Sequence, residues 1–470
     1  MDIFQFIVLS FCNLALIFWI IRRQGLASVE GYCAAYIGAA VLTDNLKLLF
    51  DYFVQPETLV LGAAEFNFRA YPTVVHIVAL LVLMAGLYLG NSKPQPITRQ
   101  CSADELDFVA YTGMALLVVG LIMSAIAIYL TGAYNAVSYF STLDNFRGGD
   151  PGKSGGFWYR GADVAVFGLA LIMAGWGKTW LRLSFVLFAM VLAEFFLKAN
   201  KGGAEIAVLF AAITLYTYNP SRFRSIAKPR VVLALAALSV LGIGVKFSLI
   251  KETAFTWKNL SGSIVGPIEA RWGDQGLYRG YCEFVNLLPK YQYLFRGYRE
   301  GMFALTEAWV PRDINTEKRD QPTKGLGFMI HADKHTYKEE TPSIELVGSV
   351  FADNGFYTLT AYLIIVGFLL GVLRKYAAGT QSSLQWHIAY VCFALFGGLS
   401  PEAGITTLMY TFIFTFGITG VAHLIVVGMF TRRFRSASAL AQYRARRDWR
   451  AEASVSRAAI PMAHRTHQIR

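Results

Sequence analysis

The residues best suited to chemistry are charged side chains in one long polar stretch, 251–343, within an otherwise apolar chain. Arginine forks bind phosphate oxygens bidentately, so a cluster of arginines favours an anionic, phosphate-bearing substrate. A histidine near such a cluster can act as a general base toward a hydroxyl. The candidates in this stretch are Arg271, Arg279, Arg296, Arg299, Arg312 and His335. The pattern predicts that the protein binds an anionic substrate and acts on it.

A tight turn before this stretch adds two lysines, in the segment Lys198-Ala-Asn-Lys201-Gly-Gly. Backbone N–H groups at the start of a helix attract phosphate oxygens, and glycine lets the backbone approach closely. Glu194 and Glu205 lie one helical turn from the lysines and would hold the ammonium groups in place. The alternative is an ordinary interfacial turn whose lysines extend toward water.

Two further side chains complete the candidate set. Arg147 lies in a glycine-rich segment, 145–160, whose Gly-Lys-Ser triplet lacks the spacing of a phosphate loop, so ATP binding is not expected. Glu345 follows the long stretch at the start of an apolar run and is a second candidate base.

His331 and His335 have the spacing of a metal pair but no third ligand, and the sequence predicts no metal and no cofactor.

The elements that must position these residues are membrane helices. Of the 470 residues 55% are hydrophobic and 16% are charged, a composition far more apolar than that of a soluble protein. Apolar runs approach the roughly 18–20 residues that cross a bilayer. The sequence predicts an all-α polytopic membrane protein of about 11 transmembrane helices. The predicted spans are 3–21, 32–52, 71–90, 106–130, 160–177, 180–197, 203–218, 231–250, 355–373, 384–399 and 404–430.

The short loops alternate in charge, with about twenty-two basic residues in one set and about six in the other. Arg374 is counted with the first set and Arg69 with the second. Because basic loops stay in the cytoplasm, the N-terminus and the long stretch are predicted outside and the C-terminus inside.

The chain is thus divided into four parts. Residues 1–250 form an N-terminal transmembrane bundle, 251–343 a large outer loop with short helices, 344–430 the C-terminal helices, and 431–470 a basic cytoplasmic tail. We interpret the tail as a contact with anionic lipid headgroups, not with nucleic acid. The five cysteines show no CxxC spacing, so neither a disulfide nor a zinc site is expected.

Several ionisable residues fall inside the predicted spans, mostly in the outer halves. Such residues usually face an interior cavity, because a charge in hydrocarbon costs a few kcal/mol. Together they predict a polar chamber that opens outward, and internal ion pairs that fix helix packing are the alternative. The residues are Asp44, Lys47, Asp51, His76, Asp163, Glu194, Glu205 and Lys246.

The layout resembles the bacterial O-antigen and exopolysaccharide repeat-unit polymerases (Wzy-type), relatives of the O-antigen ligases. The basic turn ending at Lys201 stands where that family has Ser-x-Ser-Arg-Gly-Gly, and Arg271 stands at the family's first loop arginine. Pro289–Gly297 resembles its proline–tyrosine–leucine–glycine stretch. Pro311-Arg312 matches a Pro-Arg motif, whereas Gln321-Pro322 replaces the expected Lys-Pro. Pro342, Glu345 and Asp353-Asn354-Gly355 fit the exit stretch loosely.

By this resemblance the fold is similar to the GT-C type, and the chain is a glycosyltransferase of the bacterial inner membrane with its active site facing the periplasm. The substrate would be an undecaprenyl-diphosphate-linked oligosaccharide, polymerised without nucleotide or metal. Lys198, Lys201, Arg271 and Arg279 would bind the diphosphate, and Glu345 or His335 would be the base. A chain-length regulator and a flippase are the expected partners.

Three other functions stay open at this point. An O-antigen ligase would use the same donor but transfer the glycan to a lipid A core. A flippase or exporter would move lipid-linked saccharide without chemistry, although transporters often carry inverted repeats, and we find no convincing repeat here. A structural subunit of a polysaccharide synthesis complex would use the basic tail for docking.

Overall fold

The described part of the chain is helical. In the computed structural model it comprises residues 3–25, 28, 30–31, 45–46, 48–49, 52–53, 62–94, 97–131, 158, 160–177, 179–198, 203–226, 282, 285–286, 345–378, 383–397 and 412–428. None of these residues forms a strand, which confirms the predicted all-α class for this part. The chain divides into two compact units, Met1–Thr419 and Gly420–Arg470.

The helices follow the predicted apolar segments closely. Their bounds are α1 Ile3–Gln24, α3 Gly62–Gly90, α4 Ala103–Thr131, α7 Gly161–Trp176, α8 Trp180–Lys198, α9 Gly203–Tyr218, α10 Pro220–Ile226, α16 Glu345–Ala378 and α17 Leu384–Gly397. A further apolar helix spans Phe412–Gly428. The main differences are the starts of α3 and α16, which precede the predicted starts at 71 and 355. Hydropathy locates the apolar part of a helix, and both helices continue beyond it.

Four described helices are long and apolar enough to cross a membrane: Ile3–Gln24, Ala64–Gly90, Ala103–Tyr129 and Gly355–Ala378. This supports the interpretation as a membrane protein. The predicted span 231–250 lies outside the described residues, and the span 32–52 is described only near its end, where it is helical.

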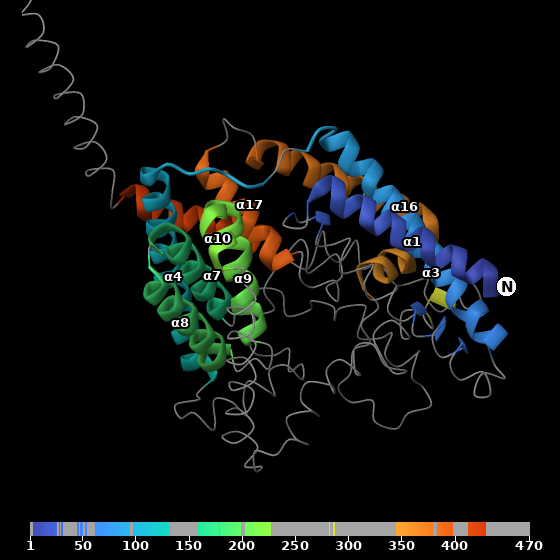
Figure 1. Ribbon diagram of the computed structural model, residues 1–470, viewed down its shortest axis with the longest axis horizontal. Coiled ribbons are helices and arrows are strands. Elements are labelled where there is room, and N and C mark those ends of the chain that lie inside the picture. The colour runs from blue at the N-terminus through green and yellow to red at the C-terminus, as the bar shows by residue number, and fades with distance from the viewer. Residues whose placement is uncertain are drawn as a thin grey trace, which may run out of the picture. The chain divides into compact units, whose positions relative to one another are not determined.

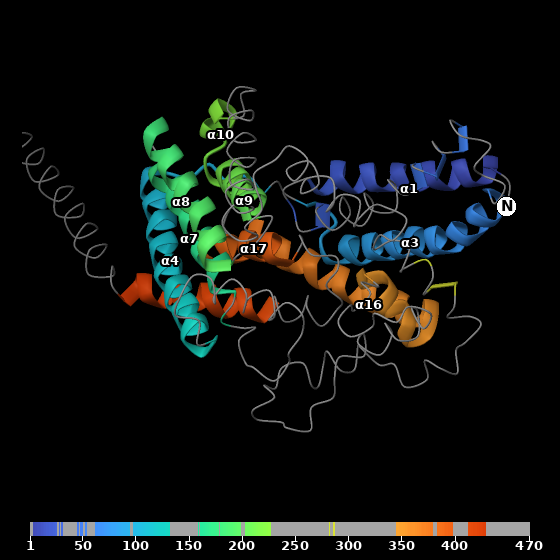
Figure 2. The same ribbon diagram turned by 90° about the horizontal axis from the view of Figure 1, so that it is seen from below.

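Helices α1, α3 and α16 lie side by side, with α3 in contact with both others (Figures 1 and 2). Glycines allow α3 and α16 to touch backbone to backbone. A Cβ at Gly86 would meet the Ile364 carbonyl oxygen at 2.5 Å, and one at Gly90, one turn further on, would meet the Phe368 carbonyl oxygen. Small residues spaced by four are typical of close helix pairs in membranes. The numbering rises together along both helices, so they run parallel.

A second set packs around α7, which contacts α4, α8 and α9 (Figure 1). Nearly every residue of α7 is buried, as expected for a helix that is apolar on all sides. Here the glycines are seven residues apart. A Cβ at Gly113 of α4 would lie 2.5 Å from the Gly168 carbonyl oxygen, and one at Gly120 would lie 2.6 Å from that of Gly161. The opposite numbering shows that α4 and α7 are antiparallel.

Helix ends that the charge pattern assigns to the cytoplasm are joined by a buried ion pair. The Arg374 guanidinium donates to the Gln24 side-chain and backbone oxygens, both at 2.7 Å, and lies 3.4 Å from the Glu30 carboxylate. The Tyr390 hydroxyl donates to the same carboxylate at 2.9 Å. The exposed fractions of Arg374 and Glu30 are 2% and 0%. Counting Arg374 as a loop residue was wrong, because α16 continues past it to Ala378. The pair with Glu30 neutralises the charge and allows it to be buried there.

A second polar cluster joins α9, α17 and the segment before α4. One ring nitrogen of His387 lies 2.8 Å from the Ile97 carbonyl oxygen, and the other lies 3.2 Å from the Tyr218 hydroxyl. Nearby, Arg99 pairs with Glu105 at 2.6 Å. Here too, every partner belongs to an end that the charge pattern assigns to the cytoplasm, so the contacts agree with the predicted alternation of the helices.

The segment before α4 ends in a capping box. Ser102 accepts from the Glu105 backbone N–H at 3.3 Å, and the Glu105 carboxylate accepts from the Ser102 N–H at 3.0 Å. Beside it, the pKa of the Cys101 thiol is raised to about 11, chiefly by burial and also by the Glu105 carboxylate, while Arg99 acts in the opposite direction. Cys101 is therefore a protonated thiol at neutral pH.

Candidate functional site

The structure describes the backbone of two predicted site residues. Lys198 is the last residue of α8, and Glu345 is the first residue of α16. The other predicted site residues lie outside the described residues: Arg147, Lys201, Arg271, Arg279, Arg296, Arg299, Arg312 and His335.

The predicted basic turn connects two helices that pack against each other. Helix α8 ends at Lys198, α9 begins at Gly203, and both also pack on α7. The sequence predicted these bounds to within one residue. Residues 199–202 between the two helices lie outside the described residues, and an anion bound before Gly203 would face the positive end of the α9 dipole.

The first half of α3 carries a row of polar residues, here called the α3 polar stripe: Glu65, Arg69, Thr73 and His76. Their spacing of three or four residues places them on one helix face. Arg69 lies 3.5 Å from the Glu65 carboxylate, and the Thr73 hydroxyl donates to the Arg69 carbonyl oxygen at 2.7 Å. His76 is fully buried.

The sequence-based assignment of Arg69 to a loop was wrong. The charge count placed it in a loop, but it lies in the second turn of α3 and is 7% exposed. The i,i+4 spacing of Glu65, Arg69 and Thr73 is a helical signal that was present in the sequence and was missed.

Two other segments reach the start of α3. The Asn45 side-chain amide donates to the Thr73 hydroxyl at 3.3 Å, so the end of the second predicted span packs on the α3 polar stripe. From the long polar stretch, the Asn286 amide donates to the Phe68 carbonyl oxygen at 2.6 Å and to the Cys282 carbonyl oxygen at 2.8 Å. Cys282 and Val285 are buried. The long stretch is therefore anchored, through these residues, at the end of α3 that the sequence predicts outside.

The first turns of α16 lie at the same end of α3. Val347, Val350 and Phe351 are buried, and the Phe351 ring meets that of Tyr71 edge-on, with centroids 6.4 Å apart. Gly355 has φ +61°, a left-handed conformation that interrupts a right-handed helix and that glycine adopts without strain. The turns of α16 before Gly355 contact α3 through the Phe351 and Tyr71 rings.

Asp163, the other member of the predicted chamber whose side chain the structure describes, lies on a different helix. Asp163 of α7 is buried, and its carboxylate is 3.8 Å from the Arg160 guanidinium. This is an internal pair of the kind that the sequence left open as an alternative. The remaining members of the predicted chamber have no described side chain: Asp44, Lys47, Asp51, Glu194, Glu205 and Lys246.

The described geometry thus brings four segments together at one end of α3: the α3 polar stripe, Asn45, Asn286 and the start of α16. Asn45 and Asn286 were not among the predicted site residues. Their neighbours on α3 are remote in the sequence, which explains why no local pattern revealed them. Amides, a buried arginine and a histidine can orient sugar hydroxyls and anions by hydrogen bonding.

No protein-family description, curated protein or solved structure matches this chain.

Proposed function

We propose that this membrane protein polymerises lipid-linked oligosaccharide repeat units. The donor is a growing glycan on undecaprenyl diphosphate, and the acceptor is a sugar hydroxyl of the next lipid-linked unit. The reaction takes place at the periplasmic face of the bacterial inner membrane.

The reaction exchanges one bond for another. The acceptor oxygen forms a bond to the anomeric carbon of the donor sugar while the bond from that carbon to the diphosphate oxygen breaks. The acceptor proton passes to a base, and undecaprenyl diphosphate leaves as the anion. The diphosphate bond is already activated, so catalysis consists of stabilising the leaving anion and positioning two bulky substrates.

The observation that carries the proposal is the anchoring of the long polar stretch on α3 by Asn286. Arg279 is seven residues from Asn286 in the sequence, so chain connectivity keeps the two within about 25 Å of each other. The segment that begins at Glu345 packs on the same end of α3 through Phe351 and Tyr71. These two contacts support the proposal that the arginine-bearing stretch and Glu345 act together at this end of α3.

Roles follow from the chemistry of the side chains. Lys198, Lys201, Arg271 and Arg279 bind the diphosphate and stabilise the charge that develops on it. Each such preorganised cation contributes on the order of 3 kcal/mol to the transition state. Glu345 or His335 accepts the proton of the acceptor hydroxyl.

The test uses the purified full-length protein with undecaprenyl-diphosphate-linked repeat units, and resolves the products by size. We expect a ladder of products that is lost in Arg271→Ala and Lys201→Ala, while Arg182→Ala, an exposed change at the other end of α8, retains it. A ladder that is unchanged in both site variants would contradict the roles assigned to these residues. Transfer onto a lipid A core acceptor in place of a second repeat unit would identify a ligase.

A further inference from the structure

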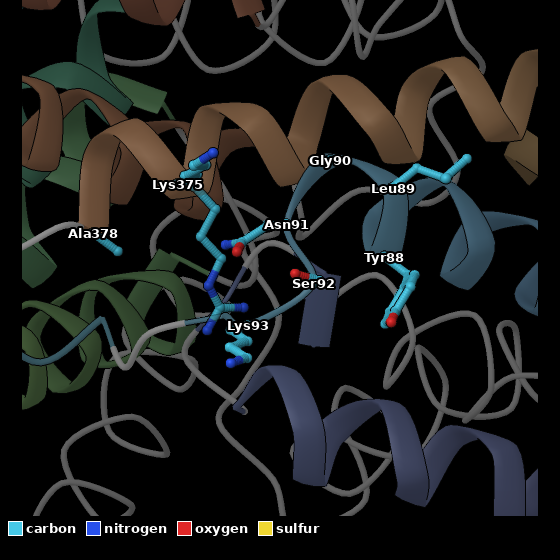
Figure 3. A pocket seen from close by; sticks show the side chains of 9 residues that line it. Tyr88, Leu89, Gly90, Asn91, Ser92, Lys93, Lys375 and Ala378 are labelled. Carbon is cyan, nitrogen blue, oxygen red and sulfur yellow. The ribbon is translucent and has the colours of Figure 1, made fainter.

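A cavity of about 330 Å³ lies where α3 and α16 end (Figure 3). Tyr88, Asn91, Ser92 and Lys93 line it from the end of α3 and the segment that follows, and Lys375 lines it from α16. The cavity is at the opposite end of α3 from the polar stripe, and it plays no part in the proposed polymerisation.

The ends of three apolar helices place this cavity at the level of lipid headgroups. Gly90 ends one membrane-length helix and Ala378 ends another, and both line the cavity. Helix α1 ends beside them, where Arg23 donates to the Ser92 carbonyl oxygen at 3.0 Å. The Arg23 guanidinium also lies 5.6 Å from the centre of the Trp19 ring and 5.1 Å from that of Tyr88. Exposed aromatic and basic side chains at such a level are typical of a membrane interface.

The charge of the cavity is positive. Arg374 also lines it, but Glu30 neutralises that guanidinium. Lys93 and Lys375 are exposed. Neither ammonium group takes part in an ion pair among the described residues. The C-terminal ends of α3 and α16 each contribute roughly half a negative charge. The two ammonium groups carry two positive charges, and the two helix ends together carry about one negative charge, so the cavity has a net positive charge of about one.

We propose that this cavity binds the phosphate group of an anionic phospholipid in the leaflet that the sequence predicts to be cytoplasmic. Lys93 and Lys375 supply the positive charge, and Ser92 and Asn91 supply hydrogen-bond donors. Basic pockets between transmembrane helices on this side of a membrane commonly hold anionic headgroups. The bound lipid would bridge α3 and α16 at the ends that the Arg374–Glu30 pair also joins.

The test is native mass spectrometry of the full-length protein in detergent, titrated separately with phosphatidylglycerol, phosphatidylcholine and inorganic phosphate. We expect phosphatidylglycerol to bind and the Lys93→Gln/Lys375→Gln variant to bind it about tenfold more weakly. The matched control is Arg182→Gln/Arg224→Gln, which removes two exposed charges from predicted cytoplasmic ends outside the cavity and leaves the affinity unchanged.

The three probes separate the possible ligands. Binding of inorganic phosphate that competes with the lipid and depends on the two lysines would keep the phosphate site but assign it to a soluble anion. Equal affinity for phosphatidylcholine and phosphatidylglycerol would overturn the proposal. An equal loss in both double variants would also overturn it, because general surface charge would then explain the binding. None of these outcomes depends on the polymerase activity.

Discussion

The two ends of the helix bundle are held by different kinds of contact. At the predicted cytoplasmic ends, Arg374 and Glu30 form a buried pair with Gln24 and Tyr390, and His387 has a partner at each ring nitrogen. At the predicted outer end of α3, Arg69, Thr73 and Asn45 are also buried. The described polar contacts that reach this end from other segments run through single amides, those of Asn45 and Asn286.

This difference distinguishes the contacts that fix the arrangement of the helices, here called the frame, from the contacts at the proposed substrate site. A buried ion pair with additional hydrogen bonds fixes one arrangement, because breaking it leaves an uncompensated charge. A single amide holds a segment in place at a cost of only about 1 kcal/mol when it is lost. We infer that the predicted cytoplasmic ends set the helix arrangement and that the predicted outer end presents the groups that meet the proposed substrate.

The largest effect is expected from Glu30→Ala. Removal of this carboxylate leaves the Arg374 guanidinium buried without its counter-ion, and the loss of stability should be about 3–5 kcal/mol. Thermal unfolding in detergent would show a clearly lowered midpoint. The double variant Glu30→Gln/Arg374→Gln removes both charges and should recover much of the loss. A single variant as stable as the wild-type protein would show that the pair does not hold the frame.

Packing between α4 and α7 gives the next effect. In Gly168→Ala the new Cβ would lie 2.6 Å from the Gly113 carbonyl oxygen, so the helices must separate, at a cost of about 1–3 kcal/mol. The matched control is Gly417→Ala, where the Cβ meets no atom within 4 Å, and it should be neutral or slightly stabilising. Equal unfolding midpoints for the two variants would contradict the close approach of α4 and α7.

A smaller effect on stability, but a large one on activity, is expected from Asn286→Asp. The carboxylate has the same shape but cannot donate to the Phe68 carbonyl oxygen, so the long stretch loses its anchor on α3. The unfolding midpoint should fall by an amount corresponding to about 1–2 kcal/mol, while product formation falls at least tenfold. Full activity with a normal midpoint would exclude a positioning role for Asn286.

The smallest effect concerns the reactivity of the Cys101 thiol toward an alkylating reagent. Because burial holds the pKa of Cys101 at about 11, the thiol stays protonated at neutral pH and the reactive thiolate is scarce. Alkylation of the Cys101 peptide, followed by mass spectrometry, should therefore accelerate about tenfold per pH unit up to near pH 11. A rate that levels off near pH 9 would show that the segment before α4 is open to water.

Much of the fold could be predicted from the sequence because hydropathy is a local property. Helices α8 and α9 begin and end almost where the apolar runs do, with the basic turn between them. The seven-residue spacing of Gly161, Gly168 and Gly175 was also a readable signal of close packing.

The polar contacts were less predictable, since their partners are remote in the sequence. The Arg374–Glu30 pair joins residues 344 positions apart, and Asn286 reaches a carbonyl 218 positions away. A count of charges assigns each base to a loop, and it fails where a distant partner neutralises the charge. Arg374 was misassigned for this reason. Arg69 was misassigned although its partner, Glu65, is only four residues away and the helical spacing of the pair was present in the sequence.

The central claim is that the outer end of this protein performs glycan transfer from a lipid diphosphate. The most direct measurement is the release of undecaprenyl diphosphate when purified protein in liposomes receives undecaprenyl-diphosphate-linked repeat units without nucleotide or added metal. We predict one undecaprenyl diphosphate for each new glycosidic bond, together with a product ladder. Lipid-linked units that cross the bilayer unchanged, with no undecaprenyl diphosphate released, would contradict the claim and identify a transporter.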